Sequence, residues 1–180
     1  MSRHQVVLGV TGSIAAYKAC DLVRRLQDKS CDVTVIMTDS AEKFVTPMTF
    51  EALSRRPVHR DMFARDVDWD MAHISLAKLA DVLVIAPATA NMIGKIAGGL
   101  ASDLLSCTAM TTKAPVLIAP AMNTDMLANR IVQENIARLK KNGVKFVEPK
   151  SGKLACGDIG RGALADVDDI VKAVCALLVR

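Results

Sequence analysis

The chain has 180 residues, of which 51% are hydrophobic, and this length favours a single domain, residues 1–180, around one core. No apolar run approaches the roughly 20 residues that cross a bilayer, and the first residues lack the pattern of a signal peptide, so we expect a soluble, cytoplasmic protein without a membrane partner. The net charge of +4 comes from scattered Lys and Arg residues, and only 3% of the residues are aromatic, so nucleic acid is not an expected partner.

Short runs of β-branched and aliphatic residues alternate with longer segments of helical periodicity. None of the short runs alternates with polar residues, as expected for strands that are covered on both faces. The predicted strands are Val6–Val10, Val33–Met37, Val82–Ala86, Val116–Ala119 and Val144–Val147. The apolar spacing predicts helices over Ala15–Gln27 and Met126–Lys140 and from Asp166 to Arg180.

This order of elements predicts an α/β protein with a parallel sheet and helices on both sides. The architecture is then a three-layer α/β/α, Rossmann-like (flavodoxin-like) fold. In such folds ligands bind beyond the carboxyl ends of the strands. The segments that follow the predicted strands are therefore where we look for chemistry.

The first predicted strand leads into a glycine-containing turn, Gly9 to Ala16. Ser13 either caps the following helix or binds a phosphate oxygen at the helix N-terminus. The turn lacks the G-x-x-x-x-G-K-[ST] string and the full G-x-G-x-x-G pattern, so a mononucleotide phosphate is favoured over a dinucleotide. Asp39, after the second strand, is either a ribose-binding acid or a helix cap.

Two further strand ends carry similar sequences, Ala86-Pro-Ala-Thr-Ala-Asn91 and Ala119-Pro-Ala-Met-Asn123. Proline ends a strand, and asparagine offers both a hydrogen-bond donor and an acceptor. These loops are either a paired binding site or two ordinary turns. His73 lies on an apolar helical stripe with Leu76, Ala77 and Ala80, where a histidine is either packed or catalytic.

The cysteines are odd in number, widely spaced and without a C-x-x-C pair. We therefore expect neither a disulfide framework nor a thiolate metal site, and no metal. Cys20, Cys31, Cys107 and Cys175 lie in helical or strand-like runs and are interpreted as structural. Cys156 lies instead in KSGKLACGDIGRG, residues 150–162, where glycines and charges leave no apolar patch to bury it.

Together these motifs resemble those of one family. GSIAAYK, HISLAKLAD, APATAN, PAMN and ACGDIG occur in the order and spacing of the homo-oligomeric flavin-containing cysteine decarboxylases, and particularly of the phosphopantothenoylcysteine decarboxylases among them. The resemblance runs from about Val6 to Ile170. The chain departs from the pattern at Thr89, Met92 and Leu127, which affects details of flavin and substrate contact rather than the reaction.

The resemblance implies FMN-dependent decarboxylation of 4′-phospho-N-pantothenoylcysteine to 4′-phosphopantetheine in coenzyme A biosynthesis. FMN oxidises the cysteine moiety to a thioaldehyde, CO2 leaves to give an enethiolate, and the reduced flavin returns the electrons. By the same resemblance His73 assists the oxidation, Asn123 holds the substrate carboxylate beside Met122, and Cys156 protonates carbon from a mobile flap. The FMN-binding residues would be Gly12, Ser13, Ile14, Thr38, Ser40, Phe44, Thr89, Ala90 and Asn91, with Asp103 as a further candidate.

Other relatives remain alternatives at this stage. Peptidyl-cysteine decarboxylases stop at the enethiol and lack the flap cysteine. Flavin prenyltransferases do not need the set of His73, Asn123 and Cys156, and some non-catalytic relatives regulate a phosphatase, usually through acidic extensions. The family also implies a homotrimer, sometimes assembled into a homododecamer, with FMN near the subunit interfaces.

Overall fold

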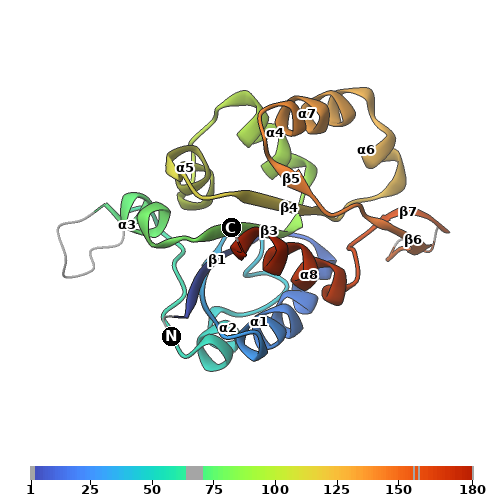
Figure 1. Cartoon of the computed structure of the whole chain (residues 1–180). Helices are drawn as coiled ribbons and strands as arrows, with labels where there is room; N and C mark the ends of the chain where they lie inside the picture. The colour runs from blue at the N-terminus through green and yellow to red at the C-terminus, as the bar shows by residue number, and fades with distance from the viewer. Residues whose placement is uncertain (1–2, 64–70, 156, 158, 180) are drawn as a thin grey trace.

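The computed structural model describes residues 3–63, 71–155, 157 and 159–179. Its centre is a sheet of five parallel strands in the order β2-β1-β3-β4-β5 (Figure 1). The strands are β1 His4–Val10, β2 Cys31–Met37, β3 Val82–Ala88, β4 Val116–Pro120 and β5 Lys145–Phe146. The parallel sheet and its flanking helices confirm the predicted fold class.

Helices connect the strands and cover both faces of the sheet (Figure 1). A 3-10 turn, η1 Ile14–Tyr17, leads directly into the first α-helix. The helices are α1 Lys18–Asp28, α2 Pro47–Ser54, α3 Ala72–Leu79, α4 Ala90–Gly98, α5 Leu104–Thr111, α6 Thr124–Ala128, α7 Arg130–Lys141 and α8 Val167–Leu178. None of the helices in the described part of the chain is long and apolar enough to span a bilayer.

Neighbouring residues along each central strand point into opposite halves of the core. Val6 and Leu8 pack with the buried residues of α1, α2 and α8, whereas Val7 and Leu83 pack with those of α3, α4, α5 and α7. Successive side chains of a strand face opposite sides, so a strand buried on both faces must be apolar throughout. This is the physical reason why the strands were recognisable as unbroken apolar runs.

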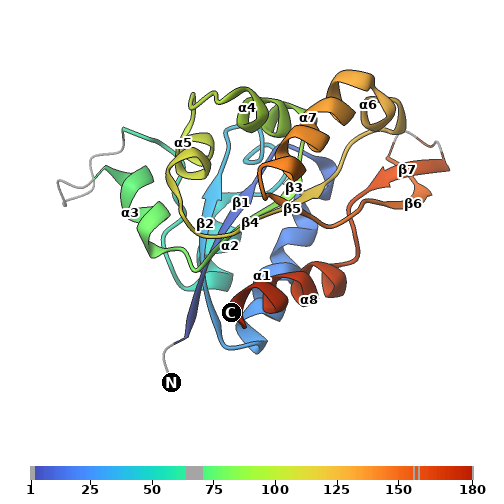
Figure 2. The same ribbon diagram turned by 45° about the horizontal axis from the view of Figure 1, so that its top comes forward.

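Two features differ from the sequence-based expectation. The helix predicted over Met126–Lys140 is two helices, because the side chain of Asn129 accepts a hydrogen bond from Ile131 N–H at 2.9 Å and starts α7 there. The strands β6 Lys150–Lys153 and β7 Ile159–Ala163 pair in antiparallel fashion as a hairpin, set apart from the main sheet (Figure 2); no strand was predicted for either segment.

Candidate active site

The loops after β1 and β3 are joined at the carboxyl edge of the sheet by Thr11. This residue is only 2% exposed, and its hydroxyl donates to the carbonyl oxygen of Pro87 at 2.8 Å. The same hydroxyl oxygen accepts the N–H of Thr89 at 3.0 Å. Sequence reasoning overlooked Thr11, although a hydroxyl residue inside an otherwise apolar Gly-Val-Thr-Gly turn was a usable signal.

The loops after β1 and β2 touch at Gly12. A methyl group added at Gly12 would lie 2.3 Å from the Cβ of Ser40, a separation that no side chain tolerates. Glycine at this position therefore lets the β1 loop lie against the β2 loop, a contact that the motif did not predict. Ile14 and Phe44, both more than two fifths exposed, lie on these same two segments.

Two predicted flavin-binding residues cap helices at this edge. The hydroxyl of Ser13 accepts the N–H of Ala15 at 3.3 Å at the start of η1. The hydroxyl of Thr89 accepts the N–H of Met92 at 3.4 Å at the start of α4. Ala90 and Asn91 form the first turn of α4, where backbone N–H groups lack partners within the helix and suit an anion.

A cavity of about 210 Å³ brings together three predicted site residues, Thr38 and Ser40 from the loop after β2 and Asp103 from the start of α5. The hydroxyl oxygen of Thr38 is buried there and has no hydrogen-bond partner among the described residues. A buried polar atom without a partner is unfavourable unless a ligand or water satisfies it. The orphaned hydroxyl and the glycine contact between the loops both fit the binding of a polar cofactor at this edge.

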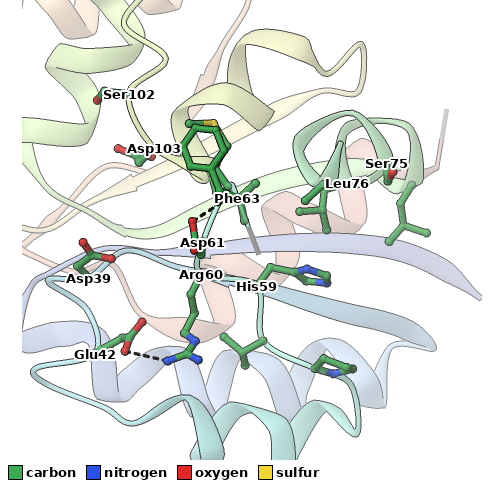
Figure 3. A pocket seen from close by; sticks show the side chains of 16 residues that line it. Asp39, Glu42, His59, Arg60, Asp61, Phe63, Ser75, Leu76, Ser102 and Asp103 are labelled. Carbon is green, nitrogen blue, oxygen red and sulfur yellow. Dashed lines mark hydrogen bonds and ion pairs between the residues drawn. The ribbon is translucent and has the colours of Figure 1, made fainter. Parts of the chain in front are cut away.

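A larger cavity of about 1260 Å³ adjoins the first and shares Asp39, Arg60 and Asp103 with it. Figure 3 shows Asp39 and Glu42 at one side of this space and Ser75 and Leu76 of α3 at the other. Its other lining residues include Pro57, Val58, His59, Asp61, Met62 and Phe63. Asp39 caps no helix, because the residues after it form turns.

Asp103 has a clear structural role at the wall between the cavities. One carboxylate oxygen accepts the N–H of Ser106 at 2.8 Å, and the other accepts from Lys95 at 2.6 Å. Partial burial opposes its ionisation, but the hydrogen bonds from Lys95 and Ser106 outweigh that effect and lower the pKa of Asp103 below its ordinary value. Its proposed contact with the flavin stays a prediction.

Replacing Asp103 with alanine is therefore expected to destabilise the fold. Loss of the cap at α5 costs about 1–2 kcal/mol of unfolding free energy at neutral pH. Because the folded-state pKa is lowered, the stabilisation is present at neutral pH and is lost as the pH falls through that pKa. Urea unfolding of the wild type and the Asp103→Ala variant should show a difference in unfolding free energy that becomes smaller on acidification. A difference that does not change with pH would contradict this role.

Asn123 ends the loop after β4 and caps α6. Its side-chain oxygen accepts the N–H of Asp125 at 2.8 Å. The preceding residue, Met122, donates its backbone N–H to the carbonyl oxygen of Gly162 in β7 at 3.0 Å. The proposed carboxylate-binding loop is thus bonded to the hairpin that follows residue 150.

His73 lies at the start of α3, and its Nδ1 atom is buried without a hydrogen-bond partner in the described part of the chain. Helix α3 packs against α5 and β1, whereas α6 packs against α7 and β7. Figures 1 and 2 both place α3 at the opposite end of the molecule from α6 and the β6–β7 hairpin. One chain therefore does not bring His73 to Asn123.

Cys156 lies outside the described residues, so its predicted role is not examined by the structure. The other four cysteines are free thiols that are buried or partly buried. Burial raises the pKa of the Cys20, Cys31 and Cys107 thiols, so these stay protonated and unreactive at neutral pH. That behaviour agrees with their structural interpretation.

With this geometry in view, the chain matches the Flavoprotein family over residues 1–179. The chain belongs to the Flavoprotein family. The family supports a flavin as the cofactor, and the residues that would hold it stay a prediction.

Relatives of this flavoprotein have informative names. The chain is 46% identical over 172 residues to the "Coenzyme A biosynthesis bifunctional protein CoaBC" of Bacillus subtilis, covering 96% of this chain and 42% of that protein. It is 45% identical over 172 residues to the "Probable phosphopantothenoylcysteine decarboxylase" of Streptococcus mutans, covering 94% of this chain and 96% of that one. The chain thus spans less than half the length of the bifunctional relatives.

Solved structures give the same picture. A PPC decarboxylase mutant complexed with pantothenoylaminoethenethiol has a TM-score of 0.88 at 32% identity, over 99% of this chain and 100% of that one. The FMN-dependent cysteine decarboxylase SpaF has a TM-score of 0.85 at 31% identity, over 98% of both chains. The predicted family and flavodoxin-like architecture are thereby confirmed.

Proposed function

We propose that this flavoprotein is a carboxy-lyase that converts 4′-phospho-N-pantothenoylcysteine to 4′-phosphopantetheine in the cytoplasm, as a step of coenzyme A biosynthesis. The observation that carries the proposal is the hydrogen bond from Met122 N–H to Gly162 O. It joins the loop of the proposed carboxylate ligand, Asn123, to the hairpin whose sequence contains Cys156. The name of the Streptococcus mutans relative supports the same substrate, and that of the Bacillus subtilis relative supports the same pathway.

The reaction requires an electron sink, because an ordinary amino-acyl carboxylate has nowhere to place the electrons left by CO2. Bound FMN supplies a two-electron acceptor and later returns the same electrons. The substrate CH2–SH group loses a hydride from carbon and a proton from sulfur, which gives a thioaldehyde. The carbon–carboxylate bond then breaks, and its electron pair moves to sulfur as CO2 and an enethiolate form. A proton on the α-carbon, a hydride on the sulfur-bearing carbon and the return of a proton to sulfur complete the product.

The loops at the carboxyl edge of the sheet are the proposed FMN cradle. Thr38 offers its buried hydroxyl, and Gly12 lets the β1 and β2 loops meet. The N-terminal turns at Ser13 and Thr89 offer backbone N–H groups to the phosphate. These neutral donors hold an anion without a buried cation.

Asn123 is the proposed ligand of the substrate carboxylate. A neutral amide N–H binds the carboxylate without the strong ground-state stabilisation that a buried Lys or Arg would give. That difference matters because the negative charge leaves the carboxylate in the transition state, and only interactions kept or gained there accelerate the reaction. Met122, next in the chain, is a proposed neighbour of the same substrate.

His73 is proposed to reach the reaction from a second copy of the chain. Its buried, unpartnered Nδ1 atom and its distance from α6 both leave it without a role in its own chain's site. Phe63 and Met71, which border the segment before α3, are 80% and 65% exposed, as suits a surface that a partner covers. We propose a homotrimer, or trimers assembled into a homododecamer.

Cys156 is the proposed donor of the final proton to carbon, so Cys156→Ser tests the proposed function directly. The variant should release CO2 but accumulate the oxidised enethiol, because a serine hydroxyl is a far weaker acid than a thiol. Mass spectrometry of the product separates the enethiol from 4′-phosphopantetheine by two hydrogen atoms. Cys175→Ser, at a partly buried structural thiol, is the matched control and should give the fully reduced product. Complete reduction by the Cys156 variant would contradict the assignment.

A further inference from the structure

The β6–β7 hairpin approaches the Asn123 loop at two glycines of β7. A methyl group added at Gly160 would lie 2.3 Å from the hydroxyl oxygen of Thr124 and 3.1 Å from its Cβ and Cγ2 atoms. A methyl group at Gly162 would lie 2.2 Å from the carbonyl oxygen of Met122. The side chain of Thr124 therefore occupies the space that any other residue at position 160 would need.

The hydroxyl of Thr124 has no polar function that the described residues explain. It is buried and lacks a hydrogen-bond partner among them, although Thr124 lies at the first position of α6, directly after the cap residue Asn123. An unpaired buried hydroxyl has an unfavourable free energy. What the side chain does provide is a contact surface for β7, beside the hydrogen bond between Met122 and Gly162.

We propose that Thr124 is a positioning residue, whose side chain sets the separation between β7 and the loop that carries Asn123. The inference rests on the proposed function, because it concerns the relative placement of Asn123, which holds the carboxylate on the α-carbon, and of Cys156, which protonates the same carbon after CO2 has left. Asn123 immediately precedes Thr124, and Cys156 precedes Gly160 by four residues in the sequence. Displacement of β7 does not involve the proposed FMN loops, and Asn123 is also held by the hydrogen bond that its side-chain oxygen accepts from Asp125 N–H at 2.8 Å.

Because CO2 release and carbon protonation depend on different residues, displacement of β7 should impair the protonation step alone. Oxidation and CO2 release precede protonation of carbon, so they should continue when β7 is displaced. Protonation should slow, because a misplacement of about 1 Å at a reacting group costs up to roughly a hundredfold in rate. The enethiol should then leave in place of the reduced product.

The test adds a methyl group on the β7 side of the contact and removes the hydroxyl and methyl groups of Thr124 on the other side. Gly160→Ala introduces the 2.3 Å clash, and Thr124→Ala removes the hydroxyl oxygen that causes it. Gly160→Ala should raise the released fraction of enethiol about tenfold, and the double variant should return to within about twofold of the wild type. Gly152→Ala is the matched control, because Gly152 pairs with Gly160 in the hairpin and an added methyl group there meets nothing within 4 Å.

Backbone hydrogen exchange gives a readout that does not depend on catalysis. The N–H of Met122 is bonded across the contact to Gly162, so its exchange should accelerate in Gly160→Ala and slow again in the double variant. An unchanged Gly160→Ala protein, or a double variant no better than Gly160→Ala, would overturn the role of Thr124. A wild-type protein that does not turn over the substrate would contradict the proposed function instead. The exchange rate of Met122 N–H would then still test whether the Thr124 side chain sets the position of β7.

Discussion

Replacing Asn123 with aspartate is expected to abolish CO2 release while the flavin stays bound. The new carboxylate would repel the substrate carboxylate and remove the amide donor that holds it. Loss of one such preorganised donor costs about 10²–10³ in rate, and the repulsion adds to that loss. Aspartate also accepts a hydrogen bond as a helix cap, so the bond to the N–H of Asp125 and the start of α6 should survive.

Asn129 offers a matched control for the Asn123→Asp substitution. That residue also caps a helix through its side-chain oxygen, which accepts from Ile131 N–H at 2.9 Å. Asn129→Asp should retain CO2 release close to the wild-type rate. Assays of CO2 and of flavin absorbance on both variants measure the difference, and normal release by the Asn123 variant would remove its proposed role.

Replacing His73 with asparagine is expected to keep the bound flavin oxidised when substrate is added. Loss of a general base lowers the rate by about 10²–10⁴. Helix α3, which carries His73, and helix α6, which Asn123 caps, lie at opposite ends of the molecule (Figures 1 and 2), so the two inactive variants should complement each other in mixed oligomers. In a head-to-tail ring each interface takes one residue from each neighbour, so about a quarter of the interfaces are intact in an equal mixture.

The mixed sample therefore gives a test of where the site lies. Co-expressed His73→Asn and Asn123→Asp chains should show about a quarter of the wild-type activity, whereas separately purified variants should show almost none. Mixed oligomers no more active than their parents would contradict a site shared between chains. Unchanged turnover by the His73 variant alone would return this histidine to the packing of α3.

The strands and their order of connection were predictable because they are buried on both faces. Val6–Val10 and Val82–Ala86 read as unbroken apolar runs for that reason, and each lies inside an observed strand. The break between α6 and α7 was missed because the apolar spacing continues through Asn129, and only its side-chain cap ends one helix and starts the next. Periodicity reports which face is buried, and it does not report such a cap.

The position of a candidate residue was predictable where it depends only on that residue's own loop. Gly12 and Ser13 lie where the turn motif predicted, at the end of β1. The hydroxyl of Thr11 was a visible signal, but its partners Pro87 and Thr89 were hidden because they are far away in the sequence. The separation of His73 from Asn123 was also hidden, because an apolar helical stripe does not show which end of the sheet its helix covers.

The most direct measurement is the mass of the product that the purified, natively isolated protein forms from 4′-phospho-N-pantothenoylcysteine. We predict a yellow protein that yields 4′-phosphopantetheine, a product lighter than the substrate by one CO2 and with no net change in oxidation state. A colourless protein that takes up no flavin, or an unchanged substrate mass in the presence of FMN, would contradict the proposed reaction.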